Sequence, residues 1–277
     1  MHRLLKKVTI GLGLVSLLLV SALPVAAADE ARIRVLHASP DAPAVDIYVN
    51  DAVVDGWTNV HFGTISDYMT VPAAGYNVKV YATGDTTSPV IDADVTLDTG
   101  MSYTVAAINP VASIQPAVFV DDPALDYDSA LVRVVHLSPD APAVDVVPDG
   151  ADPADAVVSN LEFTNATDYL ALPAGSYDLE VRLAGETTVA LQLDPLDVQA
   201  GRAYSVFAIG SAADPALGGN TLSALVALDG RLLPDSSTAT ELQPAMGMPL
   251  ALLAAAVIGL ATFAVVLRRG FGTDLAR

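Results

Sequence analysis

Two groups of polar residues in the sequence have the types and spacing that could support chemistry. They are His37, Ser39, Asp41 and Asp46, and then His136, Ser138, Asp140 and Asp145. Serine, histidine and aspartate are the components of a hydrolase triad. A nucleophilic serine also needs a base within reach and an oxyanion hole, and neither serine lies in a Gly-x-Ser-x-Gly elbow. The residue types therefore allow a hydrolase without favouring one.

A structural role for the same motif follows from its surroundings. His37 comes after Ile33 and Val35 at alternate positions, which predicts that its ring points inward from a strand. The Ser-Pro-Asp-Ala-Pro sequence that follows fixes two φ angles and supplies side chains that can bond nearby amides. We therefore expect a rigid crossover between strands, with the imidazole bonded to backbone or to a carboxylate.

Four acidic residues near the middle of the chain could bind calcium. They are Asp121, Asp122, Asp126 and Asp128. Calcium prefers hard oxygen ligands, although EF-hand spacing is absent here. Acidic runs between domains are commonly only solvated. The sequence suggests no other cofactor.

The strands that would position these residues occur twice. Residues 34–46 recur as residues 133–145 with two exchanges, and the match resumes through the pairs Phe62 and Phe163, Tyr68 and Tyr169, Tyr76 and Tyr177, Gly100 and Gly201, and Tyr103 and Tyr204. Within each copy, apolar residues alternate with period two and turn residues separate the runs. This pattern predicts an all-β fold of two tandem immunoglobulin-like β-sandwiches, in residues 29–128 and 129–230. Because each copy has a full strand set, each should fold alone.

The repeated His-x-Ser-Pro-Asp-Ala-Pro-x-Val-Asp motif and the later Pro-Ala-Gly-x-Tyr turn resemble domain of unknown function 4397. The turn is complete at residues 173–177, whereas the first copy has Ala74 before Gly75. The resemblance covers about residues 31–229. It implies an exported prokaryotic surface domain, often in tandem, and adds no catalytic residue.

The two ends of the chain predict export and anchoring. Residues 1–28 have basic residues, an apolar run and a small-residue cleavage site, as in a secretory signal peptide. Residues 245–267 are uncharged and long enough to cross a bilayer. Arg268 and Arg269 follow, so the tail 268–277 should be cytoplasmic and both repeats extracellular, with residues 231–244 as a stalk. An uncleaved anchor at the start and wall attachment near Leu233 are the alternatives.

The charge and cysteine content limit the possible partners. The chain has 13 Lys and Arg against 32 Asp and Glu, for a net charge of −19, and many of the basic residues lie in the two end segments. So acidic a surface repels nucleic acid. Cysteine is absent, so stability must come from buried cores without disulfides.

These observations favour a non-enzymatic membrane-anchored surface protein that acts in adhesion, envelope organisation or binding of an extracellular ligand or surface protein. A membrane-tethered hydrolase or sensor using the His-x-Ser-Pro-Asp motif is the alternative. The tail of residues 268–277 is too short for a cytoplasmic signalling domain.

Overall fold

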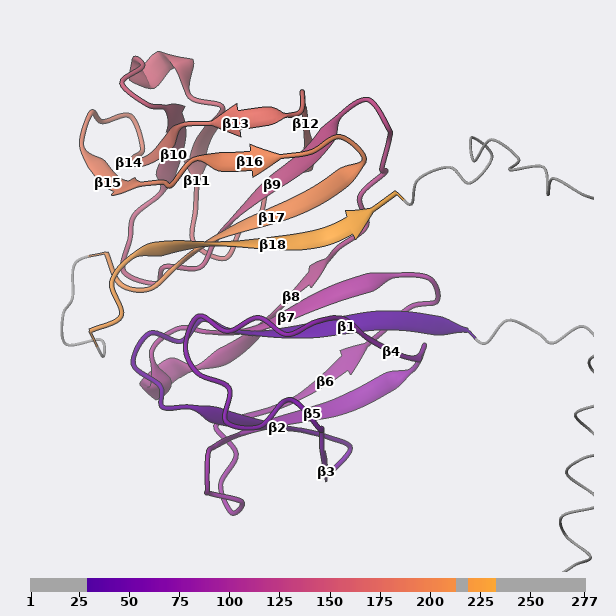
Figure 1. Ribbon diagram of the computed structural model, residues 1–277. Coiled ribbons are helices and arrows are strands. Elements are labelled where there is room, and N and C mark those ends of the chain that lie inside the picture. The colour runs from indigo at the N-terminus through magenta and orange to yellow at the C-terminus, as the bar shows by residue number, and fades with distance from the viewer. Residues whose placement is uncertain (1–28, 213–218, 233–277) are drawn as a thin grey trace, which may run out of the picture. The chain divides into compact units, whose positions relative to one another are not determined.

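A computed structural model describes residues 29–212 and 219–232, and Figure 1 shows its strands. The predicted signal peptide, the membrane span at 245–267, the tail at 268–277 and all of the stalk after Leu232 lie outside the described residues. Among the residues that are described, no helix is long and apolar enough to span a bilayer.

The first repeat is built from eight strands and one short 3-10 helix. They are β1 (Glu30–His37), β2 (Val45–Val49), β3 (Ala52–Val53), β4 (Met69–Pro72), β5 (Gly75–Ala82), β6 (Ile91–Thr96), β7 (Ser102–Ile108), η1 (Val111–Ser113) and β8 (Gln115–Val120). One sheet has the order β4-β1-β7-β8 and the other β3-β2-β5-β6. Their facing sides form a core that includes Ile33, Ile47, Val80 and Tyr103. The repeat is a β-sandwich, as the alternating pattern predicts.

The second repeat has the same plan with more interruptions. Its elements are β9 (Ala130–His136), β10 (Val144–Pro148), η2 (Pro153–Asp155), β11 (Val158–Leu161), β12 (Leu170–Leu172), β13 (Gly175–Tyr177), β14 (Leu179–Leu183), β15 (Val189–Gln192), β16 (Leu196–Val198), β17 (Arg202–Ile209) and β18 (Ser223–Arg231). The sheets are β12-β9-β17-β18, β11-β10-β14-β15 and the pair β13-β16. Pro195 lies between β15 and β16, where a continuous strand would need an N–H donor.

The strand order does not confirm the immunoglobulin-like part of the fold prediction. β1 pairs with β7 in parallel, and β9 pairs with β17 in the same way. Immunoglobulin sheets instead join antiparallel strands in the order ABED and CFG. The all-β class is confirmed, but the connections differ from those of that fold.

The two repeats share a hydrophobic core, and the described residues 29–232 belong to one compact unit. Leu36, Ala106 and Phe119 of the first repeat cluster with Val135 and Phe207 of the second. These side chains leave β1, β7, β8, β9 and β17 on the faces opposite the sandwich cores. The sequence does not predict this layer, because outward faces of a sandwich normally meet water.

Candidate functional site

The repeated motif lies in the connection that carries the chain from one sheet of each sandwich to the other. His37 ends β1 and His136 ends β9, and both side chains are buried. His37 Nε2 lies 3.0 Å from the Pro43 carbonyl oxygen, and His136 Nε2 lies 3.1 Å from that of Pro142. A carbonyl only accepts, so Nε2 carries the proton in each ring. Burial lowers the pKa of both histidines, against the opposing effect of the carbonyl contact.

The serines of the motif do not form a nucleophile pair with the histidines. Among the described residues the buried Ser39 hydroxyl has no hydrogen-bond partner, and neither does His37 Nδ1. In the second repeat, the Ser138 backbone N–H donates to His136 Nδ1 at 3.3 Å, while its hydroxyl donates to Asp140 at 3.4 Å. A triad needs the serine hydroxyl on the histidine, and neither copy shows that bond.

The four aspartates of the motif each hold a loop. Asp41 accepts from the Val111 N–H at 2.7 Å, and Asp140 accepts from the Ser211 hydroxyl and the Ala212 N–H. Asp46 and Asp145 accept from the backbone N–H groups of the matching residues Asn59 and Asn160, both at 2.7 Å. The Asn59 N–H lowers the pKa of Asp46 because it favours the ionised carboxylate.

The four calcium candidates are not gathered as a ligand set. Among the described residues, no group of three or more His, Cys, Asp or Glu side chains could hold a metal ion. Asp121 is buried and pairs with Arg133, whereas the Asp126 carboxylate accepts from the Ser129 hydroxyl and from the N–H groups of Ser129 and Asp128. Asp121 is therefore an ion-pair residue, and its place in an Asp-rich junction hid this role.

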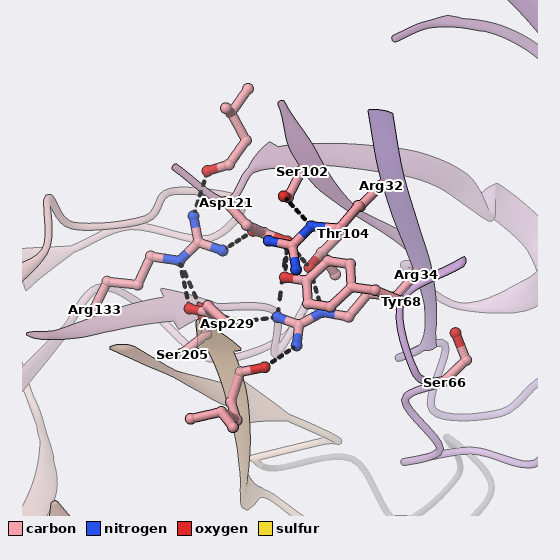
Figure 2. A network of polar contacts seen from close by, with 12 residues as sticks. Arg32, Arg34, Ser66, Tyr68, Ser102, Thr104, Asp121, Arg133, Ser205 and Asp229 are labelled. Carbon is pink, nitrogen blue, oxygen red and sulfur yellow. Dashed lines mark hydrogen bonds and ion pairs between the residues drawn. The ribbon is translucent and has the colours of Figure 1, made fainter. Parts of the chain in front are cut away.

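A buried polar network joins the two repeats, and Figure 2 shows its two arginines and two aspartates close together. Arg34 on β1 lies 2.5 Å from Asp229 on β18, and Arg133 on β9 pairs with Asp121 just after β8. Each arginine also donates to a backbone carbonyl of the other repeat, Arg34 to Leu228 and Arg133 to Val120. The two halves are related by the internal duplication, and each contributes one cation and one anion to the other.

Hydroxyl groups complete the network from within each repeat. Tyr68 donates to Asp121 and Tyr169 to Asp229, both at 2.6 Å. Thr104 and Ser205 occupy matching positions. The Thr104 hydroxyl accepts from Arg34 Nε and donates to Asp121. The Ser205 hydroxyl accepts from Arg133 Nε and donates to Asp229. Burial raises the pKa of both tyrosines, and the adjacent aspartates raise it further. Each carboxylate oxygen, hydroxyl and guanidinium group of this network therefore has a partner. Charged groups can be buried only when they are paired in this way.

The sequence contained a usable signal for this network. Arg34 and Arg133 occupy the same position of the repeat, inside strands of an acidic chain that has few basic residues. The aspartates were harder to match, because the longer loop before β18 changes their spacing between the repeats.

Together the fold and the buried network define a class of protein: a tandem pair of β-sandwiches joined face to face through a shared core and buried ion pairs. The sequence profile of the domain of unknown function DUF4397 matches residues 31–147 and 148–241. The chain belongs to this family. No curated protein matches the sequence.

Several solved structures match the chain at low similarity. The C-terminal domain of AlgF from P. aeruginosa is 19% identical, with 36% of this chain and 98% of that one covered and a TM-score of 0.28. The CBM26 module of Eubacterium rectale Amy13K, in complex with maltoheptaose, is 15% identical over 75% and 99%, with a TM-score of 0.23. The Bacillus anthracis TIE protein is 10% identical over 66% and 34%, with a TM-score of 0.22. No functional conclusion follows from likenesses this weak.

Proposed function

We propose that this protein is a non-enzymatic, membrane-anchored extracellular module whose paired sandwiches present one rigid surface for adhesion, envelope organisation or ligand capture. The observation that supports it is the use of the repeated motif. Its histidines bond to proline carbonyls and its aspartates bond to loop amides, so its polar groups serve the fold. Export and anchoring rest on the apolar segments at residues 1–28 and 245–267.

Rigidity is the second support for a presenting role. A flexible linker between two domains lets their surfaces move independently, whereas the shared core and the two interdomain ion pairs hold these repeats together. Two sandwiches held in this way can offer a binding surface that spans both repeats, at less cost in ordering on binding.

The experiment compares the wild type with the double variant Ser39→Ala and Ser138→Ala in intact cells. Within residues 29–212 and 219–232 the Ser39 hydroxyl has no partner and the Ser138 hydroxyl donates one long hydrogen bond to Asp140, so the double variant should fold and reach the surface normally. Proximity labelling from a tag on the extracellular part should give the same set of neighbours for both proteins. A hydrolytic activity that is present in the wild type and absent from the folded variant would establish the hydrolase alternative.

Topology is tested in the same cells. External protease should remove both repeats, while a tag placed after Arg277 should stay protected on the cytoplasmic side. A tag that is open to external protease would contradict the proposed orientation.

A further inference from the structure

The second sandwich contains an apolar cavity that is much larger than the corresponding space in the first sandwich. The cavity has a volume of about 210 Å³ between the two layers of the repeat, and its wall includes Val146, Val181, Leu196 and Val206. A second hollow of about 290 Å³ adjoins it, because Leu196 and Val206 line both. The corresponding space in the first repeat measures only about 30 Å³.

Two local differences between the repeats open this space. In the first repeat Trp57 packs into the core, and its carbonyl accepts from the Ile47 N–H at 2.9 Å. In the second repeat Val158 pairs with Val146, the residue equivalent to Ile47, so an isopropyl group replaces an indole. In addition, Pro195 interrupts the strand whose counterpart β6 is continuous in the first repeat. Side chains of the wall make few dispersion contacts across this space, and an apolar ligand that fills it would supply them.

The cavity opens to solvent at an apolar rim. Val157 and Leu170 belong to its wall and are 50% and 37% exposed. Asp178 also lines the cavity and Asp194 lines the adjoining hollow, and both are exposed. The Leu193 N–H donates to the Leu179 carbonyl at 3.1 Å, so the neighbouring Asp194 and Asp178 lie close together where the cavity meets the adjoining hollow. At this side of the cavity, negative charge borders the hydrocarbon wall.

The interior offers little to a polar ligand. The wall is formed by Val, Leu, Ala and Pro side chains apart from Tyr177 and Asp178, and the Tyr177 hydroxyl already donates to the Pro173 carbonyl at 2.8 Å. A polar ligand would lose its bonds to water without replacement. An apolar cavity of about 150 Å³ is enough to bind benzene, so this one can hold a ring of that size or a short alkyl chain.

We propose that the second repeat binds a short alkyl chain with a cationic head group, with the chain in the apolar cavity and the head group beside Asp178 and Asp194. Apolar burial supplies the affinity, and the two carboxylates where the cavity meets the hollow select the charge. This binding site goes beyond the proposed function, because the cavity would bind such a ligand whether or not the protein is anchored in a membrane.

Binding can be measured on residues 29–232, which contain every described strand and all four hydrophobic clusters. The probes are octyltrimethylammonium, 1-octanol and octanoate, each kept below its micelle-forming concentration. We expect octyltrimethylammonium to bind tightest and octanoate weakest, differing by about tenfold at low salt. At a hundredfold excess over Kd the cation should raise Tm by about 5–10 °C. Methyl NMR should show shifts at Val146, Val181 and Val206.

Variants separate the cavity from the two carboxylates. Val206→Phe fills the interior and should abolish binding of all three probes. Ala224→Phe blocks the wall that the cavity shares with the hollow and should have the same effect. Because Ala224 is exposed, this second variant keeps the test valid if Val206→Phe unfolds. Asp178→Asn with Asp194→Asn should remove the preference for the cation and leave 1-octanol unchanged. Val118→Ser alters an exposed valine on β8 of the first repeat and should change nothing.

The outcomes decide the proposal. Unchanged binding in the cavity-filled variants, or methyl shifts confined to the first repeat, would overturn the site. Equal affinity for octyltrimethylammonium and octanoate would overturn the cationic assignment. Loss of binding in Ala224→Phe together with a charge preference that depends on Asp178 and Asp194 would establish both parts.

Discussion

Replacing Asp229 by alanine tests whether the buried network holds the two repeats together. Asp229 is 2% exposed and accepts from Arg34 of the first repeat and from Tyr169 and Ser205 of its own. Its removal leaves a buried guanidinium and two hydroxyls without their acceptor. Breaking a buried ion pair in this way costs about 3–5 kcal/mol. Asp121 lies 3.8 Å from Arg34 and offsets part of the loss, so we expect about 3 kcal/mol.

The chain contains a single tryptophan, which makes the assay specific. Trp57 is buried in the first repeat, whereas Asp229 lies in the second. If the repeats unfold together, urea unfolding followed by Trp57 fluorescence should shift along with circular dichroism in Asp229→Ala. The expected loss corresponds to a fall in Tm of about 6–12 °C for a unit of this size.

Two further variants complete the test. Asp194→Ala removes an exposed aspartate of the same repeat and should change stability by less than about 0.5 kcal/mol. The double change Arg34→Met and Asp229→Leu removes both charges and should recover much of the loss, because no unpaired charge remains. If the Trp57 transition of Asp229→Ala stays at the wild-type midpoint, the network does not couple the repeats and the argument is wrong.

The remaining predictions concern the motif, pH and the isolated repeats. His37→Ala and His136→Ala should each lower the melting temperature, with a loss of about 1–3 kcal/mol plus a cavity cost, and chelator should not alter this result. Burial lowers the pKa of both histidines below 6.5, so their contribution to the free energy of unfolding is complete above that pH and is lost as pH falls through the lowered pKa values. A double variant with both histidines changed to glutamine should flatten this part of the pH–stability curve. An unchanged curve would exclude the histidines as its cause. Residues 29–128 alone should fold and then self-associate in sedimentation experiments, since Arg34 and Asp121 can pair with the same residues of a second copy as they pair with Asp229 and Arg133 here. A stable monomer would contradict this prediction.

The sequence predicted the elements better than their assembly. Alternation located the strands that contain Ile33 and Tyr103, and the repeated motif correctly placed a buried histidine at the end of β1. The same alternation implies that Arg34 lies on the face opposite Ile33 and Val35, but a single sequence gives no indication that this face meets another repeat. Asp121 was read as a calcium candidate for the same reason: its pairing depends on Arg133, which becomes its neighbour only after the sheets have packed. Contacts between two domains depend on the relative placement of whole sheets, which local periodicity does not encode.

The pairing of the repeats needs more than the apolar layer that they share. Hydrophobic burial is non-directional, so faces built from side chains such as Leu36 and Val135 could pack in several relative orientations. The ion pairs restrict this choice, because each guanidinium must meet its aspartate and also reach a backbone carbonyl of the other repeat. Any sliding of one sheet over the other would leave two buried cations and two buried anions unpaired, at a cost far above that of misplaced methyl groups. The charges are therefore best understood as fixing the orientation of the two sandwiches, while the apolar residues supply most of the energy that holds them together.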